Sequence, residues 1–317
     1  MDKNGSAVTE FLLLGLSEDP HVNMALFVLF LLTFLLTMLS NAALVTACVI
    51  EPRLNTPMYF FLGNLSVLDM CFSSVSVPYL LAQLLSHRKI CFSACAAQMF
   101  ACLLFGCAEC ILLAIMAYDR YAAILFPLHY RIIMSRSRCV TMLLSCWAVS
   151  LIIGIVVMVL TLRLPLCGHN VINHFFCEAT IFLKMACGDT FVTEMVIFSG
   201  SIVVMLIPSA FTLVSYMRIS AAIMRIRSSE GRHKAFSTCA SHLIVVILFY
   251  GTAIFMYMKP SSAGSANQDK IIALFYSVTP PLLNPVIYSL RNKDVKRALL
   301  KLSTRNRAQH FQKSEGW

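Results

Sequence analysis

Two acidic side chains, Asp69 and Glu109, lie inside long apolar runs of the sequence. An ionisable group at membrane depth is costly and tends to mark a functional site. If both runs are helices, a rise of about 1.5 Å per residue places Asp69 about 17 Å from Met58, and Glu109 about 16 Å from Arg120. Met58 and Arg120 stand at the inner ends of their runs, so we expect the two carboxyl groups to share a depth.

Two asparagines extend this polar level to further runs. Asn41 lies about 18 Å from Arg53, at a similar depth, and Asn284 lies somewhat nearer the inner face. Together with Asp69 and Glu109 they predict a buried cluster that could hold a cation, a proton or water. The alternative is a purely structural hydrogen-bonded network with one carboxyl group protonated, because two close carboxylates do not both ionise readily.

The tripeptide Asp119-Arg120-Tyr121 falls where the third apolar run ends. An ion pair between Asp119 and Arg120 that holds in one state and breaks in another would form a bistable latch. Arg120 could instead only extend its charge to the membrane surface.

The string His174-Phe175-Phe176-Cys177-Glu178 brings an imidazole, a sulfur and a carboxylate together, so a metal site is conceivable there. A disulfide at Cys177 would remove that ligand, and we favour no metal. The apolar runs leave four cysteines outside the membrane: Cys91, Cys167, Cys177 and Cys187. Four cysteines allow three full pairings, and their spacing does not choose among them.

No motif for catalysis or for a bound cofactor occurs in the chain: HExxH, GxSxG, a P-loop and a Gly-rich dinucleotide turn are all missing. We therefore expect neither enzymatic activity nor a cofactor. A transporter would be expected to carry paired broken helices in corresponding halves, and a pore a polar stripe through several spans. The sequence has neither pattern, which favours a sensing bundle.

The elements that position these residues are membrane-spanning helices. The chain has 317 residues, of which 59% are hydrophobic and only 13% charged, and a soluble core cannot absorb that much apolar surface. Runs long enough to cross a bilayer, roughly 20 residues each, are predicted at 24–50, 58–82, 94–118, 139–162, 196–217, 236–258 and 271–290. The last is the weakest because Pro280, Pro281 and Pro285 interrupt it. We predict an all-α membrane protein with a seven-transmembrane helix bundle.

Basic residues cluster in alternate connections and after the last run, which places those segments in the cytoplasm and the N-terminus outside. We expect an outer segment at 1–23, a membrane domain at 24–290 and a cytoplasmic tail at 291–317. The tail alternates basic with apolar residues and predicts a short amphipathic helix on the inner leaflet, or else a frayed tail. The net charge of +10 lies at membrane boundaries, which suits anionic lipid rather than nucleic acid. Asn4 begins an accessible glycosylation sequon, whereas the one at Asn64 lies inside a span.

Several ordered motifs make the chain resemble the rhodopsin-like G-protein-coupled receptors, and within them the odorant receptors of the larger, airborne-odorant class. The motifs cover nearly the whole length. They are LNTPMYFFLGNLSVLD from Leu54, MAYDRYAAI from Met116 with PLHY from Pro127, SY at Ser215, KAFSTCASHL from Lys234, FYGT from Phe249 and PLLNPVIYSLRNKDVK from Pro281, with LPLCG and HFFCE in the outer loop.

This resemblance implies specific pairings and roles. Cys91 is expected to bridge Cys177, with Cys167 to Cys187 as a second bridge and Cys91 to Cys187 as the fallback. The residues expected to carry activation and coupling are Asp119, Arg120, Tyr216, Lys234, Tyr250, Pro285 and Tyr288. The implied partner is a stimulatory heterotrimeric G protein of the olfactory type, and the implied location is the plasma membrane, in the cilia of olfactory sensory neurons.

The chain departs from the family's usual residues at a few positions. Leu125 and Phe126 replace a common Cys-Asn, Ala122 replaces Val and Gly63 replaces Ser. These changes could alter coupling strength but leave the charged motif intact.

A pocket for a small, neutral volatile is expected in the outer half of the bundle. On the third span, residues spaced along one helical face are expected to look inward. The expected lining is Cys102, Leu103, Gly106, Cys107, Cys110, Ser201, Val204, Met205, Ala253, Ile254, Tyr257, Leu274, Ser277 and Val278. For each of them the alternative is plain helix packing.

Two other functions remain open from the sequence. The same fold could serve as a chemoreceptor outside the olfactory epithelium. A small-molecule transporter built on a helical bundle belongs to a different class, and stimulus-dependent cyclic nucleotide production would distinguish it from a receptor.

Overall fold

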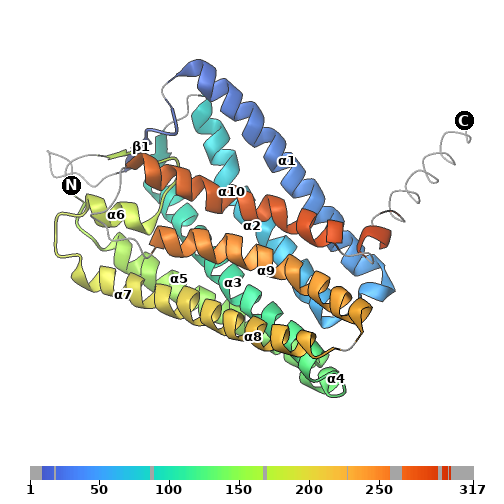
Figure 1. Cartoon of the computed structure of the whole chain (residues 1–317). Coiled ribbons are helices and arrows are strands. Elements are labelled where there is room, and N and C mark those ends of the chain that lie inside the picture. The colour runs from blue at the N-terminus through green and yellow to red at the C-terminus, as the bar shows by residue number, and fades with distance from the viewer. Residues whose placement is uncertain are drawn as a thin grey trace, which may run out of the picture.

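The computed structural model describes residues 9–17, 19–85, 89–166, 170–226, 228–257, 266–291, 295–298 and 300. Asn4 and Cys167, and the side chains of Lys234 and Tyr257, lie outside the described part. Within it, long helices run side by side and short elements close the two ends of the bundle (Figure 1).

Each predicted span is a helix in the structure. They are α1 (Pro20–Ile50), α2 (Pro57–Leu84), α3 (Phe92–Leu125), α5 (Arg136–Leu162), a composite fifth span, α9 (Ser229–Tyr257) and α10 (Ala266–Arg291). The composite consists of α7 (Phe191–Ser201), η2 (Ile202–Leu206) and α8 (Ile207–Met224), where η2 is one wider π-helical turn. Six of these spans among the described residues are long and apolar enough to cross a membrane, and the apolar part of α9, Cys239–Ile254, is shorter. The seven-helix membrane fold is confirmed.

The surface of the bundle is apolar where lipid would contact it. Leu32, Leu39 and Val49 of α1 are 60%, 70% and 79% exposed. In a soluble protein such a surface would be an aggregation hazard, but a bilayer solvates it. The core instead lies where α3 packs against α2, α5, α8 and α9.

Prolines have clear positions in these helices. Pro20 and Pro57 occupy first turns, where the missing N–H breaks no helical bond. Asp19 caps α1 by accepting a hydrogen bond from the His21 backbone at 2.8 Å. The three prolines that weakened the prediction of the seventh span lie inside α10, which nevertheless runs unbroken from Ala266 to Arg291.

The outer end of the bundle carries a small sheet that sequence reasoning missed. The N-terminal strand β1 (Glu10–Leu13) lies between β2 (Lys89–Cys91), which is antiparallel to it, and β3 (Val171–Ile172), which is parallel. Phe11 and Leu13 are fully buried, and β1 therefore ties the N-terminus to the long outer loop. This loop also contains α6 (Ala179–Met185).

The disulfide of the outer face differs from the predicted one. Cys177 is bonded to Cys95, and Cys91 is a free, exposed thiol, so both the predicted Cys91–Cys177 bridge and the Cys91–Cys187 fallback are wrong. Cys91 ends β2 before α3 begins, whereas Cys95 lies one turn into α3 and is buried against the loop. Cys187 is disulfide-bonded, and its predicted partner Cys167 lies outside the described residues.

The inner end is formed by short connections. These are η1 (Pro52–Leu54) between α1 and α2, and α4 (Tyr130–Ile133) between α3 and α5. Past α10, residues 295–298 form one helical turn in which Val295 and Ala298 are buried and Lys296 and Arg297 are exposed. Buried residues three positions apart with exposed basic residues between them are typical of an amphipathic helix.

Replacing Cys95 by Ser should cost about 2–5 kcal/mol of stability, because the bridge spans 82 residues of sequence. The Cys91→Ser change should stay within about 0.5 kcal/mol, because its thiol is exposed and forms no disulfide. Thermal unfolding of the detergent-purified protein measures both. Equal losses in the two variants would contradict the observed pairing.

Candidate functional site

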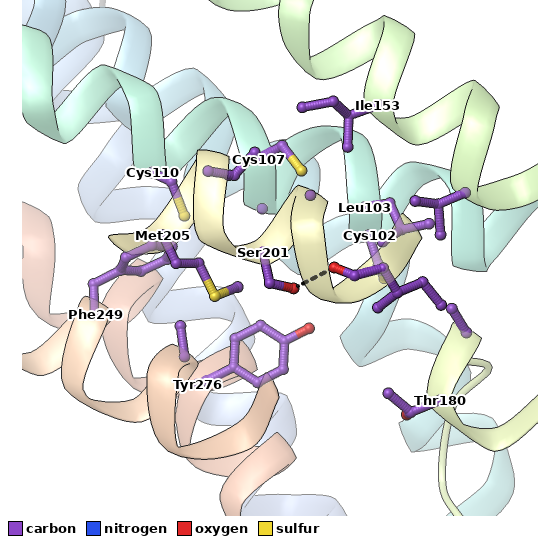
Figure 2. A pocket seen from close by; sticks show the side chains of 17 residues that line it. Cys102, Leu103, Cys107, Cys110, Ile153, Thr180, Ser201, Met205, Phe249 and Tyr276 are labelled. Atoms are coloured by element: carbon purple, nitrogen blue, oxygen red, sulfur yellow. Dashed lines mark hydrogen bonds between the residues drawn. The ribbon is translucent and has the colours of Figure 1, made fainter. Parts of the chain in front are cut away.

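The candidate site is a pocket between α3, α5, α6, the composite fifth span, α9 and α10 (Figure 2). It contains about 690 Å³ of atom-free space, counting its open mouth. It is lined by Cys102, Leu103, Gly106, Cys107, Cys110, Ile153, Val157, Ala179, Thr180, Ile197, Gly200, Ser201, Val204, Met205, Phe249, Ala253 and Tyr276.

Most of the residues predicted to contact a ligand line this pocket. All of those on α3 do so, as do Ser201, Val204, Met205 and Ala253. That they bind a ligand stays a prediction.

Four predicted residues of α9 and α10 lie outside the pocket, because their side chains pack against other parts of the bundle, and the side chain of a fifth, Tyr257, lies outside the described part. Ile254 packs against the main core, and Leu274 and Val278 pack against the cluster that contains Phe72. Ser277 is buried and donates to the Leu274 carbonyl at 3.3 Å.

In their place α9 contributes Phe249 and α10 contributes Tyr276. Other lining residues that were not predicted come from α5, α6 and α7. Nothing in the apolar run of α5 distinguishes Ile153 and Val157 from lipid-facing neighbours. Ile197 was detectable, because it lies one turn before Ser201 on the same helical face.

The chemistry of the lining is soft and neutral. Cys102, Cys107, Cys110 and Met205 bring sulfur to the pocket, and no charged side chain is among the residues that line it. Polarisable sulfur and apolar carbon favour an uncharged, largely apolar ligand.

A lid formed by the outer loop is anchored over the bundle. Gln83 of α2 donates to the Phe175 carbonyl at 2.8 Å, and the Cys177 backbone donates to Oε1 of Gln98 at 3.0 Å. Lys270 of α10 donates to the Gly15 carbonyl at 2.8 Å, next to the strand β1. These bonds and the disulfide attach the loop to several helices.

The metal site considered for the 174–178 string does not have its expected ligands. The sulfur of Cys177 is in the disulfide. The His174 ring stacks on Phe175 at 4.7 Å between centroids, and its Nδ1 accepts from the Phe176 backbone at 3.3 Å. Among the described residues, no group of three His, Cys, Asp or Glu is arranged to hold a metal ion.

The polar residues predicted at mid-depth do come together. Asn284 of α10 donates to both carboxylate oxygens of Asp69, at 3.2 and 3.0 Å. Glu109 is buried and interacts with both of these residues, and its Oε1 has no hydrogen-bond partner. Asn41 lies one step away, where its Nδ2 donates to the Pro281 carbonyl at 3.0 Å. We call Asn41, Asp69, Glu109 and Asn284 the polar hub.

The inner end of α3 differs from the predicted latch. Asp119 accepts a hydrogen bond from the Tyr130 hydroxyl at 2.6 Å, and no ion pair joins it to Arg120 in the described structure. Consecutive helical residues point about 100° apart, so their side chains do not face each other. Burial and the Asp119 charge raise the pKa of Tyr130, which keeps this phenol a donor at neutral pH.

A further hydrogen bond connects the inner halves of α8 and α9. The hydroxyl of Tyr216 lies 2.6 Å from Nδ1 of His242, which is fully buried. His242 belongs to the motif KAFSTCASHL, and the sequence alone predicted no role for it. Tyr288 is also buried nearby in the core, and its hydroxyl has no partner among the described residues.

Tyr250 of α9 connects this helix to α3 at the pocket wall. Its hydroxyl donates to the backbone carbonyl of Cys110, whose side chain lines the pocket. Its neighbour Phe249 lines the same pocket. Tyr250, one of the residues predicted to carry activation, is therefore bonded directly to the pocket wall.

Comparison with known proteins agrees with this arrangement. Residues 30–305 match the family model described as olfactory receptor. Human olfactory receptor 2D2 is 50% identical over 304 residues, which cover 96% of this chain and 98% of the relative. Human olfactory receptor 2A1/2A42 is 49% identical over 94% of this chain and 97% of its own length, and human olfactory receptor 2G6 is 47% identical over 94% and 95%. A family match of this extent, on a seven-helix membrane fold with an apolar outer pocket, means that the chain belongs to the olfactory receptor family.

Proposed function

We propose that this protein is an odorant receptor that binds a small, neutral volatile in the outer pocket and activates a stimulatory heterotrimeric G protein of the olfactory type. The observation that carries the proposal is the pocket, which has an uncharged lining and touches α9 through Phe249 and Ala253. It is neither an enzyme nor, on this proposal, a transporter.

The ligand would act by changing the balance between two conformations of the bundle. A ligand shifts such a balance only by its differential affinity for the two states. The Tyr250 bond to Cys110 gives a physical route, because α9 cannot move away from α3 without breaking that bond or taking the pocket wall with it.

The inner surface offers groups suited to a G protein. Leu128, in the connection after α3, is 92% exposed. Ile132 follows the PLHY motif and Phe236 lies in the KAFSTCASHL motif, and these two side chains are 64% and 63% exposed. Large apolar side chains that project from a polar, basic surface are typical interface anchors. Together with Arg120 and the basic Lys234 they form the surface we propose for the G protein.

The polar hub would serve as a site for an ion or a proton. Asp69 and Glu109 are both buried, and the Asn284 amide donates hydrogen bonds to both carboxylate oxygens of Asp69. One carboxyl oxygen of Glu109 has no hydrogen-bond partner. A cation or a shared proton would satisfy it.

The protein is a multi-pass membrane protein, and we propose that it resides in the plasma membrane with its N-terminus outside, in the cilia of olfactory sensory neurons. The disulfide-bonded loop suits the oxidising outer side. Glycosylation at Asn4, the boundaries 1–23, 24–290 and 291–317, and contact of the basic tail with membrane lipid belong to the same proposal. Expression outside the olfactory epithelium would leave the mechanism unchanged.

A broad volatile screen tests the function directly. Cells that express the chain together with a stimulatory G protein should produce cyclic nucleotide in response to some volatiles. If the chain is labelled at the cell surface and no volatile raises the cyclic nucleotide level, the proposal is wrong.

Replacing Arg120 by Ala should abolish the cyclic nucleotide response without preventing surface delivery, because Arg120 lies at the inner end of α3 and far from the lid. Arg138→Ala is a suitable control, since that arginine is exposed in the first turn of α5. Surface labelling and cyclic nucleotide assays measure the two effects. An unchanged cyclic nucleotide response from the Arg120 variant would contradict the activation role proposed for this residue.

A Gly106→Ala change should lower the potency of the largest agonists and spare smaller ones, because the added methyl group enters open pocket space and meets no atom within 4 Å. We expect a change of about tenfold or more, on the scale of one methylene in an apolar site. Gly63→Ala, whose new methyl group would meet Cys48 at 3.9 Å and lies outside the pocket lining, is the matched control. Concentration–response curves for agonists of graded size decide the matter, and a uniform shift for all sizes would contradict the prediction.

Leu128→Ala should weaken G-protein activation about five- to thirtyfold and leave the ranking of agonist potencies unchanged, because it removes an exposed apolar side chain worth roughly 1–2 kcal/mol at the proposed interface. Leu39→Ala, exposed on the lipid side of α1, controls for loss of apolar surface. The rate of nucleotide exchange on purified G protein is the measurement. Equal rates for wild type and the Leu128 variant would remove this residue from the interface.

A further inference from the structure

Two hydroxyl groups in the pocket, those of Ser201 and Thr180, already donate their protons to the protein. Ser201 on the fifth span donates to the Ile197 carbonyl at 2.8 Å (Figure 2). Thr180 on α6 donates to Oε2 of Glu178 at 3.1 Å. Both hydroxyls line the pocket, one from the helical wall and one from the lid.

A hydroxyl has one proton and two lone pairs. Since the protons of Ser201 and Thr180 are engaged, what these groups can offer a ligand is their lone pairs. Turning the Thr180 proton toward a ligand would take a hydrogen bond away from the carboxylate of Glu178, a residue only 4% exposed. Withdrawing a donor from a buried charged group is more costly than leaving it in place.

None of the other residues that line the pocket carries a charged hydrogen-bond donor. The thiols of Cys102, Cys107 and Cys110 are weak donors, and the thioether of Met205 is an acceptor. Tyr276 adds a phenol to the lining, a type of group that can donate or accept. Ser201 and Thr180, whose protons are already donated to the protein, can therefore act toward a ligand only as hydrogen-bond acceptors.

We propose that the ligand's polar group is a neutral hydrogen-bond donor, an alcoholic or phenolic hydroxyl, and that Ser201 or Thr180 accepts its proton. This rests on the proposed function as an odorant receptor and specifies the ligand class of the same pocket. An ether or aldehyde of the same size would bring an acceptor to acceptors and gain no bond from either group.

The test starts from the agonists that the volatile screen yields. For each agonist skeleton, three probes are compared: the alcohol, the isomeric methyl ether and the aldehyde. The alcohol should have a half-maximal concentration about tenfold or more below the other two, a ratio that corresponds to about 1.4 kcal/mol for one hydrogen bond.

The variants Ser201→Ala and Thr180→Val, singly and combined, should reduce this alcohol-to-ether ratio toward one. A merely structural defect would lower the response to all three probes equally and leave the ratio intact. Each variant has a matched control outside the pocket. Ser199 donates to the Val196 carbonyl at 3.1 Å on the same helix, and Thr190 donates to Glu194 at 2.7 Å. Ser199→Ala and Thr190→Val should keep the ratio.

The possible outcomes separate the two proposals. Ethers or aldehydes that match the alcohols in the wild-type receptor overturn the donor preference and leave the receptor function standing. A ratio that persists in the double variant removes Ser201 and Thr180 as the acceptors. A surface-delivered chain with no volatile agonist overturns both the receptor function and this inference. The wild-type comparison needs no variant, so it decides even if a variant fails to fold.

Discussion

Inside a membrane, a backbone carbonyl that loses its helical hydrogen bond to a proline needs another donor from the protein, because no water is available there. Pro285 has no N–H, so the carbonyl of Pro281, four residues earlier, loses its partner in the helix. Asn41 of α1 donates to this carbonyl at 3.0 Å, and three residues further along α10 Asn284 donates to Asp69 of α2. The seventh helix is thus bonded to the first and second at the place where prolines weaken it. The other polar groups at this depth are arranged around these two contacts.

The outer end is held in a different way, because it lies where water can reach it. Here the chain uses a covalent bond, backbone pairing and side-chain bonds to loop carbonyls. The N-terminal strand lies between two strands that come from different connections, and its buried Phe11 packs on Phe182 of α6 with ring centroids 5.6 Å apart. Since α6 carries Thr180, the N-terminus indirectly supports one wall of the pocket. The lid therefore positions pocket-lining groups as well as covering them.

The sequence predicted the helices and the polar hub well, for a shared reason. Asp69, Glu109 and Asn284 stand out against apolar neighbours, and a common rise per residue places them at one depth. Helix rotation and loop structure were harder to predict. Leu274 and Tyr276 are two residues apart on α10, and only packing decides which faces the pocket. The strand β1 has four residues, too few for a period to stand out, and its partners are remote in sequence. Cys95 was overlooked because it lies within the apolar run of α3, although the helix places it against the loop.

The geometry of α3 brings the two kinds of site within one residue of each other. Cys110 lines the pocket, and Glu109, directly before it, belongs to the polar hub. The Cys110 carbonyl accepts the hydrogen bond of Tyr250 from α9. A displacement of α3 at this level therefore acts on the pocket wall, the carboxyl cluster and the α9 contact at once. If the pocket binds a ligand as proposed, contact with Cys110 would reach the polar hub across one peptide unit of α3, with no chain of intermediate residues between the two sites.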